Sequence, residues 1–343
     1  MSKSLQSQRK VKKHAAIPLL WLNQERCGAI LLRTDYKFIE MSKIDLHIHS
    51  EYSNDGELGV KELIDKCISN NVKIISITDH NSILAIHEAV PLVLTSGLEL
   101  IPGIEIDCSY KEIDLHLLGY NIDWQSKDFI ELEESIREKV MDSFPEMINN
   151  LGKSGIRVDG NEVIEKARGK LPCGELIAEV LLTNKVYHSN KMLLPYMKGG
   201  ERSDMPYINF YHDFFAQGKP AYVKIDYIDF KDAINLVRSN GGIPIIAHPG
   251  MNLKGKEELV VELLDNGAEG LEVFNNYHTA RQIKYFADLT IQKSILMTCG
   301  SDFHGKNKPL IEIGEYRTNN KYNDYLQRSI MQIKNTAHNS KYK

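Results

Sequence analysis

Cysteine is sparse in this chain, and no two cysteines are spaced as a metal-binding or redox pair. The 343 residues contain five cysteines and no C-x-x-C pair: Cys27, Cys67, Cys108, Cys173 and Cys299. An odd, scattered set excludes a disulfide framework and argues against a closed structural zinc site built on thiolates. We therefore expect buried thiols in a reducing compartment, which favours a cytoplasmic protein.

Long apolar runs are also missing, because no stretch approaches the roughly 18 consecutive apolar residues that span a bilayer. The first forty residues begin with several Lys and Arg and continue with a short apolar run over residues 15–22. That run contains Pro18 and lacks a small-residue cleavage site, which disfavours a secretory signal. Since Met41 immediately precedes the first predicted strand, we expect residues 1–40 to be a poorly ordered extension, and we expect no membrane association.

The charge balance is nearly even, with a net charge of −4 and a pI near 6.3. These values predict no broad basic surface, so we expect no stable nucleic-acid partner, although a local basic rim can hold a phosphorylated ligand. Sequence motifs of other catalytic chemistries are also absent. The chain has no phosphate-cradling G-x-x-x-x-G-K-[ST], no G-x-G-x-x-G and no Ser-His-Asp elbow. Nothing in the composition indicates an oligomeric state.

Side chains that bind metals are abundant, and most of them follow the end of an apolar run. The segments 44–49, 73–80, 243–249 and 295–304 each begin with strand-forming residues and end in or near histidine or aspartate. Chemistry gathered at strand C-termini is typical of a barrel of parallel strands. Nine candidate ligands emerge: His47, His49, Asp55, His80, Glu105, His116, His248, Asp302 and His304.

Strand and helix signals alternate in two parts of the chain, which a long helical stretch separates. Residues 43–125 and 218–320 show β-α-β alternation, which favours an α/β fold of parallel strands with crossover helices. Residues 126–217 instead have helical periodicity with one apolar stripe. We predict that this insertion packs as a cap over the barrel mouth and selects substrate, and that residues 321–343 form a terminal helix and a frayed tail.

The pair His47-x-His49 illustrates why these residues indicate metal binding. Side chains two apart on a strand share one face, so both imidazoles can reach one ion. In Thr78-Asp79-His80, an acidic neighbour is placed to orient a third imidazole. Imidazole mixed with carboxylate suits Mn²⁺, Zn²⁺ or Fe²⁺. Nine ligands exceed what one ion uses, so we expect two or three divalent ions, an arrangement suited to displacement at phosphorus by an activated water.

These segments resemble the motifs of the PHP (polymerase and histidinol phosphatase) family over most of residues 43–310. The matching motifs are Asp45-Leu46-His47-Ile48-His49-Ser50, Thr78-Asp79-His80, Gly103-Ile104-Glu105, His116-Leu117-Leu118-Gly119-Tyr120, Ala247-His248-Pro249 and Ser301-Asp302-Phe303-His304. The resemblance implies a distorted (β/α)₇ barrel and a trinuclear metal site. It assigns one ion to His47, His49, Glu105 and Asp302, a second to Glu105, His116 and His248, and the third to Asp55, His80 and His304.

Within this family, the helical insertion and the segments Gly218–Val223 and Glu272–His278 resemble the 3′,5′-nucleoside bisphosphate phosphatases. In that branch, a histidine matching His278 lies near the substrate phosphate. Two departures stand out. Asp55 lies in Ser53-Asn54-Asp55-Gly56, which has one residue more than the common S-D-G. The substrate-binding R-P-H element of the insertion is replaced by Gly174-Glu175-Leu176, and its candidate replacements are Arg168, Lys170, Arg202 and Lys219.

We therefore predict a hydrolase of phosphoric esters that acts on a small phosphorylated metabolite or nucleotide, such as a nucleoside 3′,5′-bisphosphate. The predicted catalytic residues are His47, Glu105, Asp302 and His304, and the predicted substrate-binding residues are His278 and Lys219. Two alternatives remain open: a phosphatase of histidinol phosphate, and a non-catalytic metal-binding PHP module.

Overall fold

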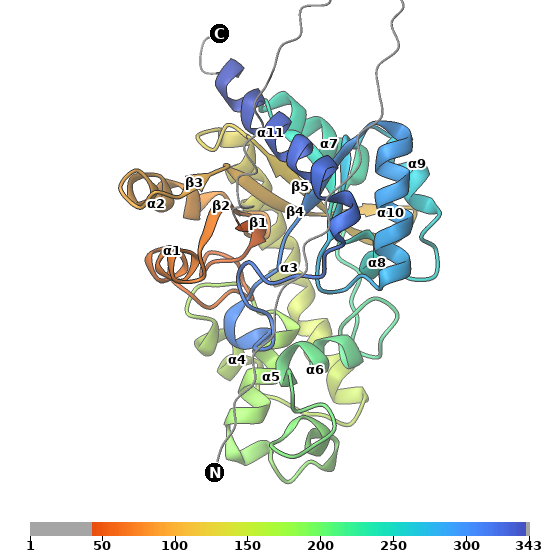
Figure 1. Ribbon diagram of the computed structural model, residues 1–343. Coiled ribbons are helices and arrows are strands. Elements are labelled where there is room, and N and C mark those ends of the chain that lie inside the picture. The colour runs from red at the N-terminus through yellow and green to blue at the C-terminus, as the bar shows by residue number, and fades with distance from the viewer. Residues whose placement is uncertain (1–42, 341–343) are drawn as a thin grey trace, which may run out of the picture. The chain divides into compact units, whose positions relative to one another are not determined.

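Two β-sheets form the centre of the computed structural model, which describes residues 43–340 (Figure 1). The smaller sheet has the order β1-β2-β3, and the larger has the order β6-β4-β5-β7-β8-β9. The predicted N-terminal extension and Cys27 lie outside the described residues. The strands are Lys43–Ile48 (β1), Val72–Ile77 (β2), Glu99–Leu100 (β3), Gly103–Tyr110 (β4), Ile113–Tyr120 (β5), Ile228–Asp229 (β6), Ile243–Ile246 (β7), Gly270–Phe274 (β8) and Leu296–Cys299 (β9).

Both predicted alternating parts contain helices between their strands. They are Val60–Ser69 (α1), Leu84–Val93 (α2), Phe230–Ser239 (α7), Pro249–Asn252 (α8), Leu259–Asp265 (α9) and Ala280–Lys293 (α10). Helix α10 begins with a capping box between Thr279 and Gln282, a strong start signal. Strands β1, β2 and β3 pair in parallel, as do β7, β8 and β9, because each pair is connected through a crossover segment.

Strands β4 and β5 depart from the predicted parallel arrangement. They form an antiparallel hairpin whose two connecting residues, Lys111 and Glu112, have φ of 47° and 64°. Positive φ at both central residues matches the right-handed twist of a hairpin. Strand β5 also runs antiparallel to β7. The expectation of parallel strands is wrong here, because Lys-Glu carries none of the Asn-Gly or Asp-Gly signal that announces such a turn.

The two sheets meet at the residues of chemical interest. Isolated bridge pairs join Ile48 to Phe303 and His80 to Glu105. The α/β class and the parallel strands are thus confirmed, while a closed ring of seven strands stays a prediction, since the hydrogen-bonded strands form two sheets.

The insertion consists of helices, and its first helix belongs to two cores. The helices are Lys127–Lys153 (α3), Gly160–Ala167 (α4), Gly174–Thr183 (α5) and Pro206–Phe214 (α6), with the 3₁₀ turns Lys185–Tyr187 (η1) and Lys191–Tyr196 (η2). Phe129 and Ile136 of α3 pack in the main core of the sheets, whereas Phe144 and Leu151 pack in a second core with α4, α5 and α6. In Figure 1 these three helices gather around the far end of α3, away from the sheets.

The C-terminal segment contains the short turn Asn320–Tyr322 (η4) and helix α11, Asn323–Ser340. The helix was predicted, but its packing was not. Leu326, Ile330 and Ile333 are buried in the main core, and α11 lies against β9. Their spacing of three and four residues forms one apolar face on an otherwise polar segment.

Two further sequence-based expectations concern cysteines and membranes. Cys67, Cys108 and Cys299 are buried free thiols, as expected, and Cys173 is partly buried. Among the helices of residues 43–340, none combines the length and the apolar character that crossing a bilayer requires.

Because α11 completes the main core, Ile330→Ala should lower the free energy of unfolding by about 2–5 kcal/mol, the usual loss for a buried Ile. Met331→Ala, one residue away and 51% exposed, is the matched control and should change stability by less than about 0.5 kcal/mol. Urea denaturation followed by circular dichroism measures both. Equal, small effects would mean that α11 contributes little to the core.

Candidate metal centre

The first two predicted ligands, His47 and His49, lie at the C-terminal end of strand β1, where this strand approaches the end of β9. His47 and His49 are fully buried, with their Nε2 atoms 3.1 Å apart, so the predicted shared face is present. A Cβ on Gly300 would lie 2.2 Å from the Cβ of His47, so the backbones approach too closely for any other residue. Asp45 joins the two segments, because one of its carboxylate oxygens accepts from the backbone N–H of Ser301 at 2.9 Å.

Glu105 is the centre of the site. It lies in β4 and is fully buried. Its Oε1 lies 3.0 Å from the ring nitrogens of both His116 and His248, and its Oε2 lies 3.0 Å from His47 and 3.2 Å from His49. One carboxylate therefore contacts imidazoles that come from β1, from β5 and from the turn after β7.

Three overlapping groups have ligand atoms within 4.8 Å of one another. They are His47, His49, Glu105 and Asp302; His49, Asp55, His80 and His304; and His80, Glu105 and His116. The structure thus brings all nine predicted ligands together, Asp55 included, although His248 joins through its contact with Glu105. Between residues 43 and 336, the buried Nδ1 of His80 and Nε2 of His304 make no hydrogen bond of good geometry, although each lies 3.1 Å from a carboxylate oxygen, of Asp107 and Asp55 respectively. Imidazole nitrogens facing carboxylate oxygens in this way fit divalent cations.

A layer of carboxylates and amides behind the ligands orients the rings. Glu272 in β8 contacts Nδ1 of His47 at 3.0 Å with one oxygen and accepts from the backbone N–H of His248 at 2.8 Å with the other. Nδ1 of His248 lies 3.0 Å from Oδ1 of Asn252. Both contacts leave Nε2 of the imidazole for the centre, as metal-binding histidines require. Sequence reasoning did not single out Glu272 or Asn252.

Asp79 makes different hydrogen bonds from those predicted. It was expected to orient His80, its neighbour in the sequence. Its carboxylate instead accepts from the backbone N–H and the hydroxyl of Ser50, both at 2.6 Å. Asp79 thereby fixes the loop that follows His49. His80 is oriented by Asp107, whose Oδ1 lies 3.1 Å from its Nδ1. Asp107 stands two residues after Glu105, and the strand periodicity could have revealed it.

Two ligands sit on strained backbone. His248 has φ of 22° and Asp302 has φ of 58°, values that favour glycine. The backbone N–H of Asp302 donates to the carbonyl of His47 at 2.8 Å, and that of His49 donates to the carbonyl of Phe303 at 3.0 Å. These bonds hold the turn after β9 against β1, and such strain concentrates at functional sites.

The electrostatics of the centre favour cations. Burial opposes charge on His47, yet Glu105 and Glu272 raise its pKa well above the usual value. Burial likewise opposes charge on Glu105, but His47 and His116 hold its pKa well below the usual range. Burial and the neighbouring His304 lower the pKa of His49 to about 4. Positive charge, whether from protons or from metal ions, is thus needed around Glu105, and the two compete.

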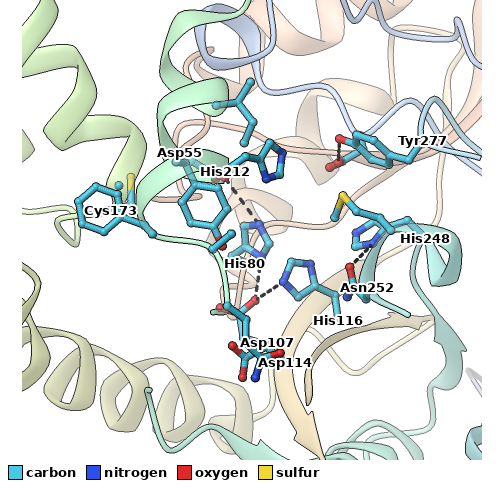
Figure 2. Close-up of a pocket in the computed structure, with 18 of the residues that line it drawn as sticks. Asp55, His80, Asp107, Asp114, His116, Cys173, His212, His248, Asn252 and Tyr277 are labelled. Carbon is cyan, nitrogen blue, oxygen red and sulfur yellow. Dashed lines mark hydrogen bonds and ion pairs between the residues drawn. The ribbon is translucent and has the colours of Figure 1, made fainter. Parts of the chain in front are cut away.

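A cavity of about 1410 Å³ opens above the ligands and is lined by the sheets and the insertion. Figure 2 shows His80, His116 and His248 among the residues that line this space, with His212 near His80 and Tyr277 beside His248. His212 belongs to α6, so the insertion contributes to the wall of the cavity. Lys219 also lines the cavity and is exposed, and its role in substrate binding stays a prediction.

His278 does not face the cavity, contrary to the sequence-based prediction. It is fully buried, and its Nε2 accepts from the backbone N–H of Gly250 at 2.8 Å. Its Nδ1 lies 2.9 Å from the carbonyl oxygen of Val273. With both ring nitrogens occupied, His278 cannot donate to a substrate phosphate. It supports the turn that carries His248.

The candidate replacements for the missing R-P-H element are mostly engaged elsewhere. Arg202 pairs with Asp213 at 3.0 Å, and Lys170 donates to the carbonyls of Ser53 and Gly56. Arg168 is exposed and does not line the large cavity. Glu175, in the position of that element, lines the cavity and is buried, which raises its pKa to about 7.

Residues 45–194 match the PHP domain family. A 5′-3′ exoribonuclease of Haemophilus influenzae is 29% identical over 286 residues, which cover 79% of this chain and 96% of the relative. A 3′,5′-nucleoside bisphosphate phosphatase of Chromobacterium violaceum is 26% identical over 277 residues, which cover 80% and 91%.

Among solved structures, that of an amidohydrolase from Chromobacterium violaceum with bound sulfate resembles this one with a TM-score of 0.63. The sequences are 24% identical, and the match covers 80% of this chain and 91% of the other, so it shows a common fold. The family match over residues 45–194, the two relatives and this common fold all make the chain similar to proteins with a PHP domain.

Proposed function

We propose that this chain is a hydrolase of phosphoric esters, a metal-dependent phosphoesterase. One observation carries the proposal: three overlapping groups of imidazoles and carboxylates, two of which share Glu105, lie at a large cavity. The relatives named as a phosphatase and an exoribonuclease support it, since both names denote cleavage of a phosphate ester.

The residues of the centre would hold two or three divalent ions. Ions bound there would polarise a phosphoryl oxygen and lower the pKa of a bound water. The chain's own part is positioning. Glu272 and Asn252 turn Nε2 of His47 and His248 toward Glu105, and Asp79 fixes the loop after His49. The catalytic roles of His47, Glu105, Asp302 and His304 follow from their places in these groups.

The preferred substrate is a small phosphorylated metabolite or nucleotide, such as a nucleoside 3′,5′-bisphosphate. Support comes from the phosphatase relative and from Lys219 on the rim. Histidinol phosphate remains an alternative substrate, with no contact in the cavity that favours it. A non-catalytic module is disfavoured, because all nine predicted ligands surround the centre.

The 5′ end of a ribonucleotide chain is the second candidate. A cavity of about 1410 Å³ exceeds the roughly 300–1,000 Å³ of common small-molecule pockets. Aromatic rings line it, and bases stack on such rings: Tyr211, Phe215, Tyr222, Tyr227 and Tyr285. Phosphate release from a nucleoside 3′,5′-bisphosphate, compared with mononucleotide release from a 5′-phosphorylated oligoribonucleotide, separates the two candidates.

Removing a ligand should abolish activity without unfolding the chain. We expect His47→Ala and Glu105→Ala each to reduce phosphate release by more than about 100-fold, beyond the usual 10–100-fold loss for an outer-shell partner. Glu105→Ala should have the larger effect, because Glu105 belongs to two of the three groups, whereas His47 belongs to one. Assays with Mn²⁺, Zn²⁺ and Fe²⁺, with metal content by mass spectrometry, measure both effects.

His87→Ala is the matched control for these two variants. His87 is exposed and stacks edge-on against Trp124, outside the ligand groups, so its loss should leave turnover unchanged. Near wild-type turnover in either ligand variant, with full metal content, would contradict the proposed function.

The insertion should contact parts of the substrate other than the reacting phosphate. His212 lines the cavity from α6, so His212→Ala should lower turnover of a nucleoside 3′,5′-bisphosphate about 10-fold more than turnover of p-nitrophenyl phosphate. The reason is that contacts with remote parts of a substrate position its reacting group. His188→Ala, in the insertion but outside the cavity, is the control. Equal losses on both substrates would show that α6 does not select the leaving group.

A further inference from the structure

Lys308 is a buried cation beside the ligand groups. Among the lysines and arginines of residues 43–336, it alone is buried. It follows the 3₁₀ turn Gly305–Asn307 (η3) and lines the large cavity. Three other cationic side chains line this cavity, Lys219, Lys254 and Arg281, and all of them are exposed. Burying an ammonium group is costly unless it is paired, so a specific partner must hold it there.

The partners of Lys308 are Asp302 and Tyr277. Its Nζ lies 2.6 Å from Oδ2 of Asp302 and donates to the hydroxyl of Tyr277 at 2.8 Å. Tyr277 also donates to Oδ2 of Asp302. The other oxygen, Oδ1, faces His49 at 3.1 Å and His47 at 3.4 Å. Lys308 therefore occupies the outer side of this carboxylate and leaves the side that faces the ligand group free.

One N–H of Lys308 remains after these two contacts, because an ammonium group has three. Within the described residues, no third acceptor lies in hydrogen-bond distance of Nζ. His212 and Glu175 of the insertion line the same cavity. Burial and the charge of Lys308 lower the pKa of His212 to about 4, so this neighbour is a neutral imidazole. A fixed positive charge with a free donor thus borders the space above the ligands.

We propose that Lys308 donates this hydrogen bond to a phosphoryl oxygen of the substrate and is a further catalytic residue. The inference rests on the proposed function. Charge-assisted hydrogen bonds to phosphate are among the strong ones, and Asp302 and Tyr277 hold the ammonium group in advance.

Inorganic phosphate is the probe that tests this role. The affinity of the Mn²⁺-loaded full chain for phosphate, measured by titration calorimetry, should fall about 10- to 100-fold in Lys308→Met. Lys308→Arg keeps the cation and should recover part of the affinity. Lys306→Met is the matched control on the same turn. Lys306 pairs with Glu179 of the insertion at 2.7 Å and lies outside the cavity, so its loss should change phosphate affinity less than about twofold.

Two results would overturn the proposal. The first is an unchanged phosphate affinity in Lys308→Met with full Mn²⁺ content. The second is a loss of Mn²⁺ in both Lys308→Met and the milder Lys308→Gln that accounts for all of the lost phosphate binding, since Lys308 would then only position Asp302. Binding is measured without turnover. A wild-type chain that binds phosphate through Lys308 but hydrolyses no ester would therefore contradict the proposed function and leave this inference standing.

Discussion

A single buried carboxylate, Glu105, sets the requirements for the whole centre. A carboxylate removed from water must be matched by positive charge and hydrogen-bond donors, and removing one partner of such a buried pair typically costs about 3–5 kcal/mol. Four imidazoles lie within 3.2 Å of its two oxygens and come from three separate parts of the chain. The hairpin that carries Glu105 and His116, and the turn that carries His248, must therefore be in place together. Divalent ions satisfy the same requirement with more charge than neutral imidazoles provide.

Much of the ligand set was predictable, because its signal is local. An apolar run followed by histidine or aspartate marks a strand end, and parallel strands bring such ends together. The supporting residues were not predictable in this way. Glu272 lies in the middle of β8 and contacts His47 in β1 of the other sheet, more than two hundred residues away in the sequence. His278 shows the opposite failure, since its motif was recognised, while the direction of its ring depends on the carbonyl of Val273 and the N–H of Gly250.

The fold class followed from the alternation of strands and helices, but two features did not. The hairpin of β4 and β5 could not be predicted from its turn, because Lys111 and Glu112 adopt positive φ although they are not the Asn-Gly or Asp-Gly pair usual in such turns. The boundary of the insertion was placed before α3, because its apolar stripe has one continuous period. The first part of that stripe packs in the main core and the second part in the core of the insertion. The spacing between Ile136 and Phe144 is the same as elsewhere in the stripe, so the sequence does not show where one core ends and the other begins.

The shared helix α3 determines how the cap and the sheets can move. A lid domain that opens and closes is usually connected to the rest of the protein by loops. Its hinges are a few residues whose backbone dihedral angles change strongly. Here one end of the cap is continuous with a helix anchored beneath the sheets, so rotation would have to bend that helix or pull Phe129 out of the core. Pro145 removes one backbone hydrogen bond inside α3 and is the natural place for a small bend. Access to the ligand groups should then be governed by rearrangements of side chains around an opening that stays in place, so that the shape of the cavity selects among substrates.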